Sequence, residues 1–162
     1  MSNASESPGA TSWDVLSSEV EDTRTRVGVQ VEFVSDALAQ QQHSVLRPFI
    51  NRGITSRDDY RTLAVIRRFG ERGASITETA EILGVSPGTI SNRVERLRKE
   101  GHLMRIPNER DRRSHRVSFT PQGAELVAQM NEAMINVHKS FLEALDETQC
   151  EQLSELLEIC ME

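Results

Sequence analysis

The chain has 162 residues, of which 37% are hydrophobic and 27% are charged, and its formal net charge is −6. A chain of this length can bury a core, and no apolar run approaches the roughly 20 residues that would span a bilayer. The beginning of the chain lacks the charged and apolar regions of a signal peptide, so we expect a cytoplasmic protein with no membrane partner.

The N-terminal third predicts a tail followed by helix. Residues 1–11 are rich in Ser, Gly, Ala and Pro and offer little to bury, so we expect a disordered tail. From Trp13 to about Phe49, apolar residues recur at helical spacing and predict one long helix or two pieces, which Pro48 should end. We assign residues 12–53 to N-terminal helices.

Two further helices are predicted before residue 84. The first runs from Thr55 to Arg72 and has four residues facing inward: Tyr60, Leu63, Ile66 and Phe69. The second starts at Ser75, which forms the pattern of a capping box with Glu78. Gly84 supplies the left-handed residue that ends this helix.

The next helix follows after a very short turn. Ser86 can cap it, and Pro87 occupies its first position, where a missing N–H costs nothing. Two short helices joined at a glycine are the form of a helix-turn-helix, whose second helix can approach DNA bases. DNA contacts are predicted for Ser86, Gly88, Thr89, Ser91, Asn92, Arg93 and Arg96. Solvent-facing roles, or pairing of Arg96 and Arg98 with acids along the helix, are the alternatives.

A hairpin is predicted after this helix. Its strands are Leu103–Ile106 and Arg116–Phe119, and the polar segment between them is too long for a two-residue turn. Three arginines crowded at a loop tip repel one another unless an anion lies opposite, and the DNA phosphate backbone is such an anion. We therefore predict a DNA-binding wing, with a solvated loop as the alternative. Its candidate residues are Arg110, Asp111, Arg112, Arg113 and His115.

Charge is distributed unevenly along the chain. Residues 86–116 hold nine Lys or Arg against four acidic residues, a formal charge of +5, which leaves −11 for the remainder. The sequence after Val117 contains one lysine and nine acidic residues. This polarity would present a basic lobe, residues 54–120, to a polyanion and hold the acidic end away.

The C-terminal residues 121–162 predict two more helices. Thr120 and Pro121 start one that runs to about Leu145, and Asp146 can cap the other. The last helix carries an a/d-like seam formed by Cys150, Leu153, Leu157 and Cys160. Because one winged domain has no room to bury such seams, we predict a two-fold homodimer. The expected fold is mainly α with a small β-hairpin wing, flanked by N- and C-terminal dimerisation helices.

Residues 54–123 resemble the multiple-antibiotic-resistance regulator (MarR) family. The resemblance is most specific in the runs Gly84–Leu97, Asp111–Arg113 and Phe119–Gly123. It implies a homodimeric winged-helix transcription regulator, more often a repressor, whose recognition helices enter successive major grooves. It also implies that Arg113 reaches the minor groove and is steadied by Asp111.

The resemblance further implies a small-molecule effector, commonly an aromatic or phenolic acid, bound between the dimerisation helices and the DNA-binding lobe. His43, Arg47 and Tyr60 are polar residues near the helix ends that would line such a pocket, with capping or surface roles as the alternative. Release of DNA would follow if the ligand binds better to a dimer whose recognition helices are misplaced. Two helices related by a two-fold axis also predict a palindromic operator.

Other functional classes find little support in the sequence. The four histidines and two cysteines show no metal-ligand spacing, and no nucleophile, acid or base has a recognisable partner, so we expect neither a metal nor a cofactor nor an enzyme. Cys150 and Cys160 lie too far apart on one helix for a disulfide within it, and a redox role for them stays open. The alternative function is a winged-helix protein-interaction module that does not bind DNA.

Overall fold

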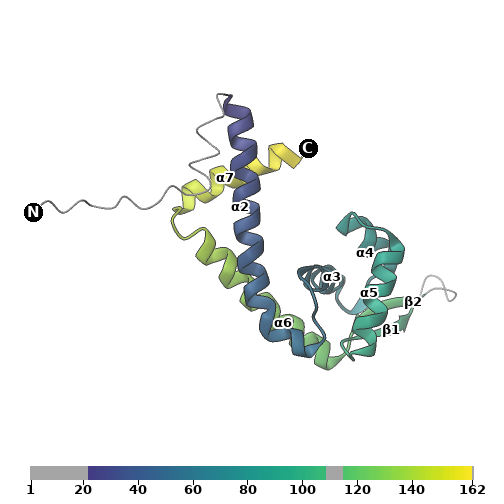
Figure 1. The fold of residues 1–162 in the computed structure, drawn as a ribbon. Coiled ribbons are helices and arrows are strands. Elements are labelled where there is room, and N and C mark those ends of the chain that lie inside the picture. Colours follow the sequence, from purple (N-terminus) through teal and green to yellow (C-terminus); the bar gives the residue numbers. More distant parts are fainter. Residues whose placement is uncertain (1–21, 109–114, 162) are drawn as a thin grey trace, which may run out of the picture. The chain divides into compact units, whose positions relative to one another are not determined.

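The computed structural model describes residues 22–108 and 115–161 (Figure 1). These residues form six α-helices, two 3-10 helices and one two-stranded antiparallel hairpin, so the predicted fold class is confirmed. The chain divides into two compact units, residues 1–41 and 42–162. No helix in the described part of the chain is both long and apolar enough to cross a membrane.

Helix α2 (Thr23–Leu46) passes through Gly28 without a break. It ends before Pro48, which lies in the first turn of the 3-10 helix η1 (Arg47–Arg52). The segment expected to be helical between Trp13 and Glu21 lies outside the described residues. Three valines of α2, each about half exposed, recur at helical spacing: Val27, Val31 and Val34.

Helix α3 (Arg57–Arg68) is shorter than the predicted Thr55–Arg72. Ser56 and Asp59 form a capping box that fixes its start, and the chain then continues as the 3-10 helix η2 (Gly70–Arg72). Helix α4 (Ile76–Leu83) begins with the predicted Ser75–Glu78 capping box and ends at Gly84, whose φ is 65°. Helix α4 and the helix that follows it form the helix-turn-helix (Figure 1).

Helix α5 (Pro87–Lys99) follows, and the Ser86 hydroxyl accepts a hydrogen bond from the Thr89 backbone N–H at 3.1 Å, as its predicted cap should. Strands β1 (Leu103–Pro107) and β2 (His115–Phe119) pair in register from Leu103–Phe119 to Pro107–His115, one residue longer than predicted. Two backbone hydrogen bonds between Ala74 and Val117, at 2.9 and 2.8 Å, attach the hairpin to the segment before α4.

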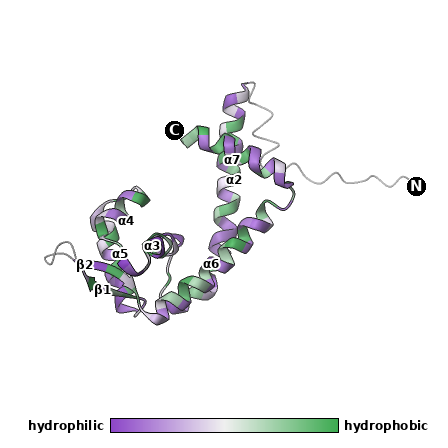
Figure 2. Ribbon diagram, turned by 180° about the vertical axis from the view of Figure 1, so that it is seen from behind, coloured by the Kyte–Doolittle hydropathy of each residue, from purple (hydrophilic) through white to green (hydrophobic). Residues whose placement is uncertain are grey.

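Helix α6 (Pro121–Phe141) starts at Thr120 as predicted but ends four residues before Leu145, where the chain turns. Helix α7 (Glu147–Met161) is capped by Asp146, which exchanges hydrogen bonds with Gln149. Hydrophobic residues recur along α2 and α7 (Figure 2). No residue of α7 is buried, whereas α6 contributes buried side chains to the core.

One core joins the winged-helix elements to α6. Its buried members come from the end of α2, from α3 to α5, from both strands and from α6. They are Leu46, Ile54, Leu63, Ile66, Ala74, Ala80, Ile90, Val94, Leu97, Leu103, Val117, Leu126, Val127, Met130 and Met134. Ile90, Val94 and Leu97 form the buried face of α5, so the opposite face of that helix is directed away from the core.

Candidate nucleic-acid interface

The first half of α5 presents a small, polar surface. Ser86, Gly88, Thr89, Ser91 and Asn92 are all exposed, and the hydroxyls of Ser86 and Thr89 lie 2.8 Å apart. A Cβ atom added at Gly88 would meet only the Ser86 hydroxyl oxygen, at 3.9 Å, so nothing within the chain requires glycine there. A surface of short side chains allows another molecule to approach the helix backbone closely.

Arg93 does not face outward with these residues. Its guanidinium donates to the Asp58 backbone carbonyl, the Asp58 carboxylate and the Thr62 hydroxyl, at distances of 3.3, 3.1 and 3.0 Å. The side chain is only 15% exposed. The acceptors belong to α3, so the local sequence of α5 does not reveal them, and contact of Arg93 with DNA stays a prediction.

Arg96 is also directed toward α3. It donates to the Gly53 carbonyl at 2.8 Å and to the Asp59 carboxylate, which is fully buried. The same carboxylate accepts from the Thr55 N–H at 2.7 Å, and Thr55 and Ser56 complete its set of donors. A buried carboxylate needs such partners to remain charged, so Asp59 anchors α5 to the start of α3. Arg96 thus pairs with an acid of α3, and contact of Arg96 with DNA stays a prediction.

A second pair of ions lies along the outer side of α5. Arg98 forms two hydrogen bonds to the Glu95 carboxylate, at 3.0 and 2.9 Å, and Arg105 lies 3.5 Å from the same group. The hydrogen bonds from Arg98 hold the pKa of the Glu95 carboxyl below its usual value. Pairing along the helix, the alternative we left open, therefore applies to Arg98. The groups are exposed, and such pairs contribute little to stability.

The base of the wing is tied to α4 by Arg116. Its guanidinium donates to the Gly73 carbonyl at 2.9 Å and to the Glu78 carboxylate, and it lies 6.0 Å from the Phe69 ring. Burial raises the pKa of the Glu78 carboxyl, but hydrogen bonds from Ser75 and Arg116 outweigh it, so the pKa is lowered. Glu78 thus caps α4 and holds β2 at the same time.

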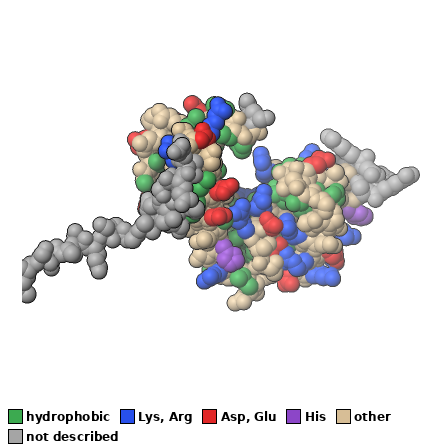
Figure 3. Space-filling view, turned by 45° about the horizontal axis from the view of Figure 1, so that its top comes forward, with side chains coloured by type: hydrophobic (Ala, Val, Ile, Leu, Met, Phe, Trp, Pro, Cys, Tyr) green, Lys and Arg blue, Asp and Glu red, His purple; other side chains and the backbone are tan. Residues whose placement is uncertain are grey.

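The predicted wing residues Arg110, Asp111, Arg112 and Arg113 lie outside the described residues. His115 is described: it is exposed, begins β2 and pairs with Pro107 across the hairpin. In Figure 3 the blue Lys and Arg side chains of the winged-helix lobe lie intermixed with red acidic ones. Residues 54–120 hold fourteen Lys or Arg and nine acidic residues, so the lobe keeps a formal charge of +5 despite its internal ion pairs.

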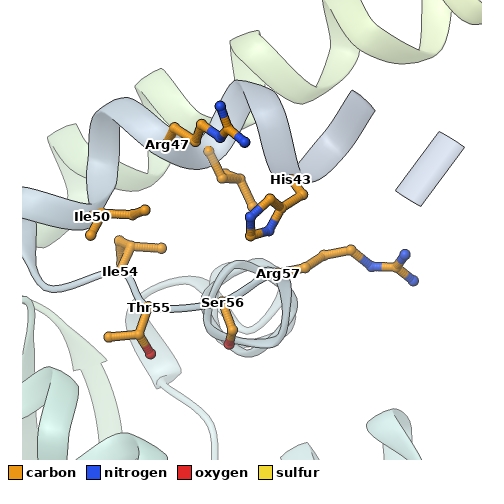
Figure 4. Close-up of a pocket in the computed structure, with 8 residues that line it drawn as sticks. His43, Arg47, Ile50, Ile54, Thr55, Ser56 and Arg57 are labelled. Carbon is orange, nitrogen blue, oxygen red and sulfur yellow. The ribbon is translucent and has the colours of Figure 1, made fainter. Parts of the chain in front are cut away.

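A small hollow lies where α2 ends and α3 begins (Figure 4). The structure brings two predicted pocket residues, His43 and Arg47, together there with Arg57, which the sequence did not single out. The other lining residues are Leu46, Ile50, Ile54, Thr55 and Ser56. Tyr60 does not line it. Its hydroxyl donates to Asn131 at 3.4 Å, and burial raises its pKa.

Within residues 22–108 and 115–161, no group of three or more His, Cys, Asp or Glu side chains could hold a metal ion. Cys150 is half-buried and Cys160 is exposed, and both are free thiols.

Comparisons with known proteins agree with this geometry. Residues 52–114 match the MarR family model. The chain is 30% identical over 100 residues to the HTH-type transcriptional regulator PecS of Dickeya dadantii (strain 3937), and the alignment covers 61% of this chain and 60% of PecS. The aligned region thus spans less than two thirds of that relative.

Solved structures share the fold at low identity. The apo form of MarR from E. coli is 21% identical, with a TM-score of 0.67, and the match covers 89% of this chain and all of MarR. A cysteine-to-serine mutant of MarR from E. coli complexed with operator DNA is 20% identical, with a TM-score of 0.71, over 88% of this chain and 100% of that one. CouR from Rhodococcus jostii RHA1, bound to p-coumaroyl-CoA, is 20% identical, with a TM-score of 0.72, over 85% and 93% of the two chains.

The helix-turn-helix, its hairpin and the helices around them define a winged helix-turn-helix protein. The family match over residues 52–114 and the similarity to PecS agree with the sequence resemblance to the MarR family, and the solved structures share the fold.

Proposed function

We propose that this protein is a sequence-specific DNA-binding transcription regulator. The observation that carries the proposal is the exposed, small and polar first half of α5 on a helix that ion pairs fix to α3. In a helix-turn-helix the N-terminal residues of the second helix contact base edges in the major groove. Gly88, which has open space around it, then has a function, since a side chain there would hold the helix away from the bases.

The wing would add contacts that do not depend on base identity. Arg110, Arg112 and Arg113 would supply positive charge to the phosphate backbone, and His115 at the start of β2 would add to this contact. The family resemblance implies that Asp111 steadies Arg113. The net charge of +5 on residues 54–120 supports an anionic partner. PecS is named a transcriptional regulator, and a mutant of MarR has been crystallised with operator DNA, which supports the same role here.

We further propose a two-fold homodimer on a palindromic operator. The supporting observation is the apolar surface of α7, where Leu156, Leu157 and Ile159 are 62%, 44% and 67% exposed. In the proposed a/d seam, Cys150 and Leu153 are half-buried and Leu157 and Cys160 are exposed within one chain. A second copy would cover these residues, because isologous dimers bury the same face of both subunits.

The hollow beside His43 is our proposed effector site. His43, Arg47 and Arg57 offer donors for a carboxylate, and three aliphatic side chains offer an apolar wall: Leu46, Ile50 and Ile54. Thr55 and Ser56 line the hollow and also donate to Asp59, so a ligand there would alter the anchor of α5 and release the operator. The proposal that the regulator is a repressor rests on the family resemblance alone.

A duplex from the region upstream of the protein's own coding sequence, compared with a scrambled duplex of equal length, tests DNA binding. Fluorescence anisotropy at roughly 50 and 200 mM salt should show tighter binding to the upstream duplex, and affinity should fall about a thousandfold if six phosphates are neutralised. The alternative, a winged-helix protein-interaction module, predicts no binding to either duplex at the lower salt concentration.

A further inference from the structure

The arginines of the recognition helix are engaged by other groups of the protein. Arginine bound to guanine through two hydrogen bonds is the commonest specific contact in the major groove. Arg93 already donates to three oxygen atoms of Asp58 and Thr62 and is 15% exposed. Arg96 donates to Gly53 and to buried Asp59. Neither guanidinium is available to a guanine while the helix keeps its place.

The remaining cations of α5 lie at its far end. Arg98 is eleven residues beyond Pro87, about 16 Å along the helix axis, and it is bound to Glu95. Lys99 is the last residue of the helix. Because the N-terminal residues of a recognition helix contact the base edges, these two positions lie nearer the phosphate backbone.

Moving Arg96 toward DNA would remove the nearer of the two cations beside the Asp59 carboxylate, because the other, Arg93, reaches it only at 3.7 Å through Nε. The exposed fraction of Asp59 is 0%, so water cannot replace the lost partner, and removing one partner of a buried ion pair is strongly destabilising. A contact to guanine would have to offset that penalty before it contributed any specificity. The ion pairs therefore bind the two arginines to α3 and do not leave them free to contact bases.

The exposed side chains in the first half of α5 are uncharged. Ser91 and Asn92 are exposed on α5, next to Gly88 and Thr89. An asparagine amide matches adenine, since it can accept from N6 and donate to N7, and a threonine methyl can contact the methyl group of thymine. The recognition surface thus fits A·T pairs better than G·C pairs.

We propose that α5 reads adenine through Asn92, and that Arg93 and Arg96 are positioning residues that make no base contact. This inference rests on the proposed DNA-binding function and adds a specificity to it. According to this inference, each half-site requires an A·T pair opposite Asn92. No residue of α5 recognises guanine.

The test uses the full-length protein and duplexes in which single purines lose their major-groove N7 acceptor. We expect 7-deazaadenine at one position of each half-site to lower affinity by about 5- to 150-fold, and Asn92→Ala to abolish that difference. Replacing each guanine by 7-deazaguanine should leave affinity unchanged. A loss at 7-deazaguanine that Arg93→Lys or Arg96→Lys abolishes would overturn the inference, and so would an Asn92→Ala protein that still distinguishes adenine from its analogue.

Asp58→Asn provides an independent variant should the Arg93 substitution fail to fold. It removes a carboxylate partner of Arg93 that is 52% exposed, and we expect the base preference of the wild-type protein to persist. A new preference for guanine in this variant would support a reading role for Arg93 and contradict ours. Failure of the wild-type protein to bind any duplex would instead refute the proposed function. The two failures can be distinguished, because binding to unmodified duplexes is measured before any base is replaced.

Discussion

The most consequential single residue is Asp59, which no local pattern distinguishes. In the sequence it is one of two acids near the start of a helix, where carboxylates are common because they favour the helix dipole. In the structure its carboxylate is fully buried and receives hydrogen bonds from Thr55, Ser56 and Arg96. The partner is 37 residues away, so spacing within either helix could not reveal the pair.

Asp59→Asn should lower the free energy of unfolding by about 3 kcal/mol or more, because Arg96 loses a buried partner. Urea unfolding measures this change. Asp58→Asn is the matched control: its carboxylate is 52% exposed, and we expect a loss of at most about 1 kcal/mol. Equal losses in the two variants would show that Asp59 is not the anchor we describe.

Glu78 predicts a pH dependence of stability. Its pKa is lowered in the folded protein, so its contribution to stability is fully present above the usual carboxyl pKa of 4.5 and is lost as the pH falls through the lower folded value. Unfolding free energies of wild type and Glu78→Gln should therefore converge as the pH is lowered from about 6 to about 3. Parallel curves over that range would contradict the proposed Ser75–Glu78–Arg116 linkage.

At the scale of elements, local sequence patterns predicted the helix caps and strands that hydrogen bonds between nearby residues determine. The caps at Ser75 and Ser86, the end of α4 at Gly84 and both strands are where the sequence indicated. Helix ends without such signals were misplaced: α6 stops at Phe141 although apolar spacing continues to Leu145. The direction of the arginines on α5 also escaped prediction, since their acceptors lie on α3.

A substitution at Gly88 should change the stability of α5 and its DNA binding in opposite directions. Gly88→Ala should raise the free energy of unfolding by on the order of 0.5 kcal/mol, because alanine favours helix and the space is open. Duplex affinity should fall, since the methyl group holds the helix away from the bases. Gly123→Ala is the contrasting control: its Cβ would lie 1.9 Å from the His102 carbonyl oxygen, so we expect it to destabilise the fold. Unchanged affinity in Gly88→Ala would count against the proposed interface.

At the scale of the whole molecule, the positive charge and the exposed apolar residues lie in different parts of the sequence. Residues 54–120 carry +5 and the remainder −11, while exposed apolar residues recur on α2 and α7. The sequence predicted both features from composition and spacing. It could not predict which side of α7 stays uncovered, because Leu156 and Ile159 lie outside the predicted a/d seam and are its most exposed leucine and isoleucine.

The double substitution Leu156→Glu and Ile159→Glu should shift the protein from dimer to monomer, because it places charges in the proposed interface. Sedimentation velocity across a range of concentrations measures the shift. Ile82→Glu is the control, since Ile82 is 50% exposed on α4, outside the proposed interface, and should leave the dimer intact. A double variant that remains as dimeric as wild type would place the interface elsewhere.

Selection of duplexes by the full-length protein from a randomised pool tests the central claim most directly. We predict enrichment of an imperfect palindrome whose half-sites are centred about one helical turn, roughly 34 Å, apart, as two recognition helices related by a two-fold axis require. Recovery of unenriched sequence, or of a single half-site without its mate, would contradict the account.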